Sequence, residues 1–598
     1  MARNLNICVL LLTSVAVFSS CNGFLDKFPL DKESLDTYFQ DESQMQAFSN
    51  AFYPVIFNGP FYDAENDLYF KRSLPSRIKG GTSRPTPSSG GGWNWSTLRD
   101  INTMIAHIAD YPDEAVREEY TGLARFFRAY FYYKMVRDFS DVPWYDHELG
   151  SAEDEQLYKP RDPRELVMSK MVEDVDYAIA HLSDTPKLYR VTKWTALAFK
   201  SRFCLFEGTW RKYHGDSGEG HDFNWYLAQA ADAAKEFITT SPYTIHNTNN
   251  EAEDYTMVFS QQSSPMDEVI LAKNYSTNTQ ISHFATFNTF CVNGDGLCIN
   301  KKYIDSFLMK DGTRFTDIPG WETMQFFNQV TDRDPRLAQI IRTPGYHRID
   351  DNTKRVPEFA NSLTGYQSVK YAVSYEIIAD SWQASDNDMP IYRAAEVYLN
   401  YAEAMAERTD VKISQADLDL SITPIRKRAG MPELKLADAN ANPDLNYMGS
   451  SKYGFSNVTG DNKGVILEIR RERMVELAQE GDFRWYDLMR WKEGKCIEQD
   501  IKGMYFPGPG EYDFDGDGIY DFCLYDSDEK PQTSCLYSQQ LNKDGFYLTD
   551  GTSGYVDSHR GQKHVFDEKR DYLYPIPTGE IALNPALTQN PGWKDIKR

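Results

Sequence analysis

The chain has 598 residues, of which 41% are hydrophobic and 25% charged, a composition that predicts a folded protein with a sizeable core and excludes a disordered one. It carries 64 lysine and arginine residues against 88 aspartate and glutamate residues, a net charge of −24, which argues against nucleic acid or anionic lipid as a partner because both attract positive charge. Aromatic residues make up 14%, and their flat faces suit the recognition of rings, although most are expected in the core.

Residues 1–20 are predicted to be a secretory signal. Arg3 precedes an apolar run at 7–18, which is shorter than the ~18 residues that a membrane-spanning helix needs. Two serines then precede Cys21, and cleavage just before a cysteine is typical of a bacterial lipoprotein. We therefore expect a lipid anchor at Cys21; the alternative is an ordinary signal peptide with an incidental cysteine. No later stretch is long and apolar enough to span a bilayer.

The remaining cysteines contain no CxxC pair, which disfavours a zinc ribbon. In an oxidising compartment, Cys291 with Cys298 and Cys523 with Cys535 could close short loops. Six cysteines allow many pairings, so the connectivity stays open.

Most of the chain has helical periodicity. Pro163 stands at the start of a pattern in which apolar residues recur on one face up to Leu182. Several helix patterns pair at a spacing near the ~34 residues of tetratricopeptide hairpins, although their degeneracy leaves the repeat unproven. We predict a mainly α fold, a tetratricopeptide-like helical superhelix. Its other strong helices are expected at 123–139, 192–207, 224–239, 391–407, 464–480 and 483–492.

Two stretches interrupt the helices. Glycine, asparagine, aspartate, serine and aromatic residues dominate 241–390 and again about 496–575, which predicts loops and short strands. Loops on a rigid scaffold often carry binding residues. We therefore divide the chain into an N-terminal helical region, 21–240, and a C-terminal region, 241–598, that begins with the irregular insertion 241–390.

Residues 513–521 have the spacing of a calcium-binding loop. Acidic side chains occupy positions 1, 3, 5 and 9, Gly518 stands at position 6, and position 7 offers a backbone carbonyl. Leu524 replaces the acid expected at position 12, and the alternative is a surface turn. Clustered carboxylates repel one another without a cation, so we expect a structural calcium ion. Its predicted ligands are Asp513, Asp515, Asp517, the carbonyl of Ile519, and Asp521.

Five segments carry a family resemblance. They are CNGFLD (21–26), ARFFRAYFYYKMVRDFSDVPW (124–144), YRAAEVYLNYAEAMAE (392–407) with IRKRAGMP (425–432), EIRRERMVELAQEGDFRWYDLMRW (468–491) and YLYPIPTGEIALNPALTQNPGW (572–593). In order and spacing they closely resemble the SusD/RagB family of Bacteroidetes outer-membrane lipoproteins, over essentially the whole chain after the signal.

The resemblance implies a helical superhelix with a loop-rich face that binds ligand. Family members are non-catalytic, capture glycans or, in the RagB branch, peptides, and cover a SusC-type TonB-dependent transporter. We therefore expect a lipid-anchored, surface-exposed protein of the bacterial outer membrane. The arginines of the signature segment, Arg471, Arg473 and Arg490, are expected in helix-surface and inter-helix ion pairs.

A glycan site needs a flat aromatic for the sugar face and carboxylates or amides for its hydroxyls. Trp93 and Trp95 follow a flexible glycine-rich loop at 80–92, where the resemblance implies a binding tryptophan. Because Trp93 and Trp95 are two residues apart with one residue between them, we expect only one of the two side chains to face ligand and the other to lie in the core. Asp63, Asn66 and Asp67 are expected to help them; the alternative is a solvated turn.

A third candidate is the stretch 284–298, ahead of the MKDGTR turn, where relatives place another binding aromatic. Phe290, or a loop closed by Cys291 and Cys298, could form a wall there.

Motifs of enzymes are scarce. The chain has no HExxH, GxSxG or Walker motif, and its ten histidines are scattered without metal-ligand spacing. We predict non-catalytic capture of a glycan and its delivery to a SusC-like transporter, with peptide capture as the alternative. A glycoside hydrolase is a weaker alternative. Its two catalytic carboxylates are identified by the distance between them, which a sequence does not give.

Overall fold

The structure is a computed structural model that describes residues 38–56, 63–149, 154–215, 220–276, 278, 281–290, 297–376, 381 and 383–594. The predicted signal and Cys21 lie outside these ranges. Within them, none of the helices combines the length and the apolar character that a membrane span requires.

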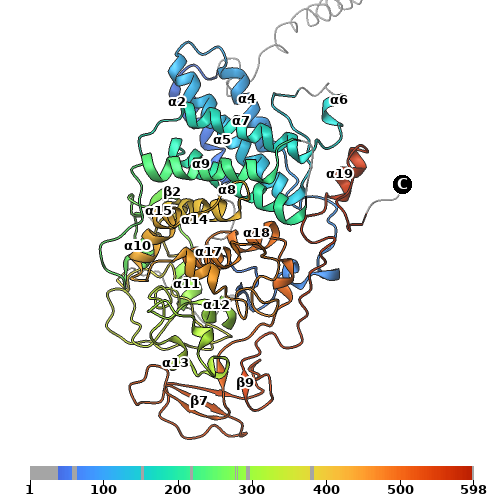
Figure 1. Cartoon of the computed structure of the whole chain (residues 1–598). Coiled ribbons are helices and arrows are strands. Elements are labelled where there is room, and N and C mark those ends of the chain that lie inside the picture. The colour runs from blue at the N-terminus through green and yellow to red at the C-terminus, as the bar shows by residue number, and fades with distance from the viewer. Residues whose placement is uncertain are drawn as a thin grey trace, which may run out of the picture.

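Long helices build the upper half of the molecule (Figure 1). The pairs α5/α7 and α8/α9 pack side by side, as expected for helical hairpins. The helix α5 begins nine residues before the predicted start, because the Asp113 side chain caps it by accepting from the Val116 N–H at 3.2 Å. The helices of this half are α2 (Glu42–Asn50), α4 (Ser96–Ile108), α5 (Glu114–Phe139), α6 (Asp154–Leu157), α7 (Arg164–His181), α8 (Lys193–His214) and α9 (Phe223–Thr240). The short helix α3 (Ser76–Lys79) lies lower, where the Arg77 guanidinium is 4.8 Å from the centre of the Trp485 ring.

A second set of helices continues the array from the C-terminal region. The helix α14 packs against α9, α15 and α17. These helices are α14 (Ala394–Glu407), α15 (Gln415–Arg428), α16 (Leu436–Ala441), α17 (Lys463–Glu476), α18 (Phe483–Arg490) and α19 (Thr578–Leu583). The fold is thus mainly helical, as predicted.

Other predicted helix boundaries are wrong as well: the helix predicted at 192–207 runs on to His214. The pattern at 391–407 begins with strand β4 (Met389–Arg393), which pairs antiparallel with β2 (Val269–Lys273), and becomes helical only at Ala394. The helix predicted to reach residue 480 ends at Glu476, and Gln479 then takes a left-handed φ of 59°.

Short elements and loops fill the lower half. Strand β7 pairs antiparallel with β6 and parallel with β8, and together with the β5/β9 pair they form a lobe at the bottom of Figure 1. The elements here are β1 (Tyr69–Phe70), α10 (Asp254–Ser260), α11 (Ala285–Phe290), β3 (Cys298–Ile299), α12 (Lys301–Ser306), η5 (Phe315–Asp317), η6 (Trp321–Thr323), α13 (Phe326–Val330), β5 (Tyr505–Phe506), β6 (Gly510–Tyr512), β7 (Phe522–Tyr525), β8 (Tyr537–Gln540) and β9 (Gly554–Tyr555).

The described residues form two main hydrophobic cores. The larger core joins N-terminal side chains such as Phe127 and Phe199 to C-terminal ones such as Leu399 and Trp485. The boundary that we drew at residue 240 therefore runs through one continuous core. The second core lies under the loops and the strand lobe.

Buried ion pairs join α17 to other segments of the C-terminal region. Glu476 on α17 pairs with Arg336 at 3.1 Å, Arg393 at 2.7 Å and Arg428 at 2.5 Å. Arg393 extends the network to Glu268 at 2.8 Å. Each of these side chains is at most 2% exposed. Charges so far from water must pair well to persist, because an unpaired one costs several kcal/mol.

The signature arginines belong to similar pairs. Arg473 bonds Asp487 at 2.7 Å, Arg490 bonds Glu403 at 2.5 Å, and Arg471 pairs with Asp444. The expectation of inter-helix ion pairs is confirmed. The expectation of helix-surface pairs is wrong, because all three arginines are buried.

Candidate functional site

The tryptophans predicted to stack on a sugar pack into the larger core. Trp93 is 7% exposed, with the rings of Phe139 and Trp95 packed edge-on against it at 5.0 and 5.3 Å. Trp93 is thus the core member of the pair that the sequence predicted, which leaves Trp95 as the predicted ligand contact. Trp95 is half-buried beside Phe131 and Tyr145, and its contact with ligand stays a prediction.

The acidic loop at 63–67 is buried rather than solvated. The Asn66 side chain accepts from the backbone N–H groups of Leu68 (2.7 Å) and Tyr69 (2.9 Å), which fixes a turn. Asp67 pairs with Arg484 and Lys302, each at 2.7 Å. Burial alone would raise the pKa of Asp67, but these two cations outweigh it and lower the pKa to about 2. The prediction that Asn66 and Asp67 bind ligand is wrong, because both are committed to the fold.

The third candidate stretch, 284–298, lies only partly within the described residues. Cys298 lies in β3 and is fully buried, so the prediction that it lines a surface site is wrong. Phe290 ends α11, and its side chain, like Cys291, lies outside the described residues. In the other predicted pair, Cys523 and Cys535 are both free thiols.

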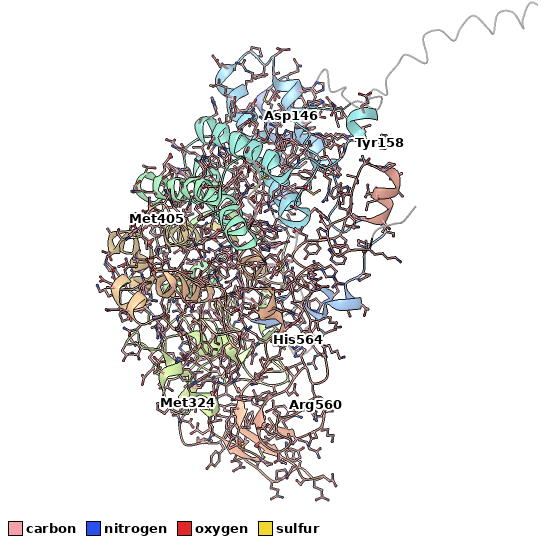
Figure 2. All side chains as sticks on the ribbon, turned by 45° about the vertical axis from the view of Figure 1, so that its right-hand side comes forward. Asp146, Tyr158, Met324, Met405, Arg560 and His564 are labelled. Carbon is pink, nitrogen blue, oxygen red and sulfur yellow. The ribbon has the colours of Figure 1, made fainter. Side chains whose placement is uncertain are left out.

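Partly exposed aromatic rings gather instead beside the strand lobe. Trp321 on η6 meets Tyr447 and Tyr453 edge-on at 5.4 and 5.7 Å, and Tyr555 on β9 meets Tyr505 on β5 at 5.5 Å. Met324, which follows η6, marks the lower part of the molecule in Figure 2. We define the aromatic groove, a shallow hollow of about 30 Å³, by its lining residues. They are Asn300, Lys301, Lys302, Asp305, Trp321, Glu322, Lys452, Tyr453, Asp500, Lys502 and Tyr555.

Polar groups frame the rings of this groove. The Lys301 ammonium lies 5.3 Å from the Trp321 ring centre and pairs with Asp305 at 2.8 Å. Tyr453 donates its hydroxyl hydrogen to Glu322 at 3.2 Å. The groove therefore offers aromatic edges and faces beside hydrogen-bonding groups, which is the combination that a sugar ring requires.

A second, larger hollow lies next to the groove. It encloses about 560 Å³ and is lined by Phe327, Tyr505, Tyr512 and Tyr520, among others. Tyr505 lines this hollow, and its ring contacts Tyr555 of the aromatic groove. The two hollows are therefore neighbours on either side of this ring pair, although they share no lining residue.

Sequence reasoning did not select Trp321. It lies just after the MKDGTR turn, whereas we searched ahead of that turn, and the preceding Gly320 has a left-handed φ of 81°. The sequence feature that could have indicated Trp321 is a single tryptophan that directly follows a glycine within a loop-rich stretch.

The predicted calcium loop borders the larger hollow, which Asp513 and Gly516 help to line. Carboxylate oxygens of Asp513, Asp515 and Asp521 lie within 4.8 Å of one another, so these three could hold a cation. Burial, and then repulsion from the neighbouring aspartates, raises the pKa of Asp521. Asp517 instead accepts from the Ile519 N–H at 2.8 Å, and the Ile519 side chain is 63% exposed. The structure gathers three of the predicted ligands.

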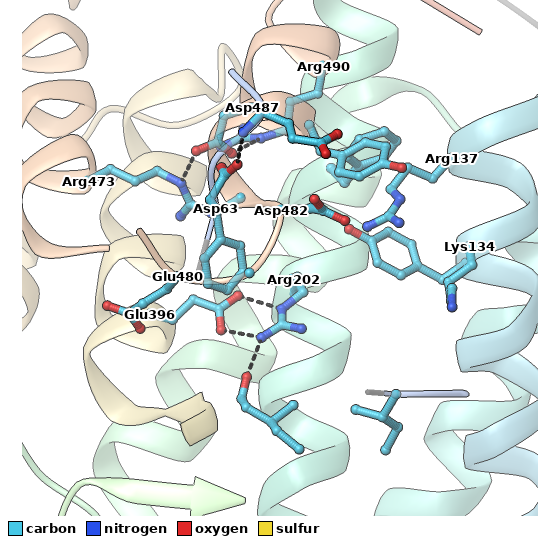
Figure 3. A pocket seen from close by; sticks show the side chains of 18 of the residues that line it. Asp63, Lys134, Arg137, Arg202, Glu396, Arg473, Glu480, Asp482, Asp487 and Arg490 are labelled. Carbon is cyan, nitrogen blue, oxygen red and sulfur yellow. Dashed lines mark hydrogen bonds and ion pairs between the residues drawn. The ribbon is translucent and has the colours of Figure 1, made fainter. Parts of the chain in front are cut away.

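A charged pocket of about 370 Å³ lies between two helices of the N-terminal region, α5 and α8, and three of the C-terminal region, α14, α17 and α18 (Figure 3). Ion pairs occupy much of its wall: Arg202 pairs with Glu396 at 2.6 Å, and Arg473 pairs with Asp487 at 2.7 Å. We call it the central pocket. It shares no lining residue with the aromatic groove.

Asp63 is the one residue of our predicted acidic group that lines a pocket. It is 3% exposed, and its Oδ1 atom accepts from the Glu65 N–H at 3.2 Å. Its Oδ2 atom has no hydrogen-bond partner among the described residues. Arg77 approaches only to 3.8 Å, and burial raises the pKa of Asp63 to about 7. Asp63 therefore faces the central pocket and not a site beside Trp93 or Trp95.

Comparison with known proteins gives a consistent result. A profile of the SusD family matches residues 235–593, and a profile described as "Starch-binding associating with outer membrane" matches residues 94–205. A SusD-like protein of Bacteroides ovatus is 21% identical, over 97% of this chain and 96% of its own. A crystal structure of a SusD-like carbohydrate binding protein from Bacteroides fragilis is 21% identical, covers 93% of this chain and 100% of its own, and superposes with a TM-score of 0.66. A second SusD-like structure from that species gives 20% identity, 95% and 100% coverage and a TM-score of 0.64.

Proposed function

This chain belongs to the SusD family, and we propose that it captures a glycan at the bacterial outer membrane without altering it chemically. The aromatic groove is the observation that carries the proposal, because Trp321, Tyr453 and Tyr555 stand half-buried beside charged and amide groups. The description of the second matching profile, which names starch binding and the outer membrane, supports the same function.

A glycan array with the purified protein tests this proposal, and calorimetry on the best glycan then measures affinity. We expect micromolar to millimolar binding, since a shallow site gains little beyond the cost of association. New reducing ends after incubation would instead support a glycoside hydrolase. Binding only to a peptide panel would support the alternative of peptide capture.

We further propose that the protein delivers its glycan to a SusC-like TonB-dependent transporter and is lipid-anchored at Cys21. The family membership supports the partner, and the apolar run before Cys21 supports the anchor. Cys21→Ala is expected to abolish labelling with a palmitate analogue and to release the protein from the membrane fraction. Affinity purification of the wild-type protein from membranes should recover a large outer-membrane barrel. Labelling of the variant, or recovery without any barrel, would contradict the respective proposal.

We also propose a structural calcium ion at Asp513, Asp515 and Asp521. Calcium bound only by the folded state would add about 2.7 kcal/mol to the free energy of unfolding at 100-fold excess over Kd. A chelator should therefore lower the Tm of the wild-type protein. It should leave the Tm of a variant carrying Asp513→Asn and Asp515→Asn unchanged.

The matched control is Asp526→Asn, an exposed aspartate in the same lobe and outside the cluster. This variant should respond to the chelator like the wild type. If the chelator does not change the Tm of the wild-type protein, the calcium proposal is contradicted.

A further inference from the structure

Among the described residues, two cations of the central pocket make no hydrogen bond to a carboxylate. Lys134 and Arg137 stand one turn apart on α5, and both line the pocket. Arg137 makes no hydrogen bond to any described group; its nearest carboxylate, Asp138, lies 3.6 Å away. Within the described ranges, Lys134 donates only to the backbone carbonyl of Val55, at 3.3 Å. The other arginines of the pocket are held by carboxylates, so these two cations remain available to an anion.

The arrangement holds Arg137 ready for such an anion. Its guanidinium lies 3.3 Å from the centre of the Tyr486 ring, and Tyr486 is itself fixed by donating to Asp138 at 2.6 Å. A planar guanidinium that is already positioned binds a carboxylate with two parallel hydrogen bonds at little entropic cost.

The opposite side of the pocket offers an oxygen acceptor. In Figure 3, Lys134 and Arg137 project from α5 on the right, Asp63 lies toward the left, and Asp482 stands between them. The Oδ2 atom of Asp63 is buried without a hydrogen-bond partner in the part of the chain that the structure describes. A buried polar atom without a partner is costly in a native protein, and a ligand hydroxyl would satisfy it.

The size and access of the pocket fit a small molecule. Its volume of about 370 Å³ lies within the roughly 300–1,000 Å³ of typical ligand pockets. Gly481 and Asp482 are exposed at its rim, so the interior is reachable from solvent.

We propose that the central pocket is a second binding site, separate from the aromatic groove, for a small polyhydroxylated carboxylate such as a sugar acid. The carboxylate of the ligand lies between Lys134 and Arg137, and its hydroxyls bond Asp63 and Asp482. Because the two sites share no residue, this proposal does not depend on the groove.

Calorimetry with sodium D-glucuronate, and with D-glucose as its neutral counterpart, tests the proposal. We expect glucuronate to bind at least about tenfold more tightly than glucose, because only the acid uses the charge-assisted hydrogen bonds. Arg137→Gln is expected to weaken glucuronate binding by roughly tenfold or more. Arg117→Gln, which alters an arginine of the same helix outside the pocket, serves as the control and should bind glucuronate like the wild type.

A second variant keeps the test informative if Arg137→Gln does not fold. Lys134→Gln removes the other cation without touching Tyr486, and circular dichroism reports whether each variant is folded. Equal affinity for glucose and glucuronate overturns the proposal, as does wild-type affinity in both folded variants. Absence of heat with glucuronate at tens of millimolar overturns it as well, whatever the glycan array shows for the groove.

Discussion

Glu476→Gln is expected to lower the free energy of unfolding by about 3–5 kcal/mol, the usual cost of removing one partner from a buried ion pair. The Glu476 carboxylate is fully buried and pairs with three arginines, Arg336, Arg393 and Arg428. Glutamine keeps the shape but leaves these cations without their shared negative charge. Urea denaturation followed by circular dichroism measures the loss.

The same network predicts a dependence on pH. Burial alone would raise the pKa of Glu476, but the three arginines outweigh it and hold the pKa far below its ordinary value. A carboxyl whose pKa is depressed by folding stabilises the protein above its unfolded pKa, and this contribution falls as the pH drops toward the folded value. The difference between wild type and Glu476→Gln should therefore be full at neutral pH and shrink below about pH 4, near the ordinary glutamate pKa.

An exposed ion pair provides the matched control. Glu173 pairs with Lys170 at 2.8 Å, but its side chain is 60% exposed. Glu173→Gln should change the free energy of unfolding by less than about 1 kcal/mol, since water screens such pairs. Equal losses in the two variants would mean that the buried network adds nothing beyond a surface pair.

The sequence predicted the elements whose signal is local. The apolar face of α7, with Val167, Met171, Val175 and Ala178, is fully buried as its periodicity indicated. The β4 strand was missed because its pairing partner β2 lies more than a hundred residues earlier in the chain. Periodicity within one segment contains no information about such a partner.

The candidate site was harder to predict for the same reason. Asp67 looked like a loop carboxylate, but its partner Arg484 lies 417 residues later. Trp93 follows a glycine-rich loop, yet Phe139 of another helix covers it. Trp321 lines the aromatic groove together with Tyr453 and Tyr555, and both tyrosines lie more than a hundred residues later in the chain.

Trp321→Ala is expected to weaken binding of the glycan found on the array by at least tenfold, which corresponds to about 1.4 kcal/mol. Truncation of a tryptophan at the centre of an interface often costs 2 kcal/mol or more, and the ring contact itself contributes about 0.5–1.5 kcal/mol beyond the area it buries. Calorimetry measures the affinity. Trp321→Phe should recover part of it, because phenylalanine keeps an aromatic face.

The competing location is Trp95, which is also half-buried. If Trp95→Ala loses the glycan while Trp321→Ala binds it like the wild type, the ligand lies beside α4 and the groove assignment fails. Trp321 also packs against Tyr447 and Tyr453, so its truncation could act by loosening the fold. The Tm of each variant separates the two effects: loss of binding at an unchanged Tm places the sugar on the Trp321 ring, whereas loss of binding that scales with the fall in Tm assigns Trp321 to the scaffold.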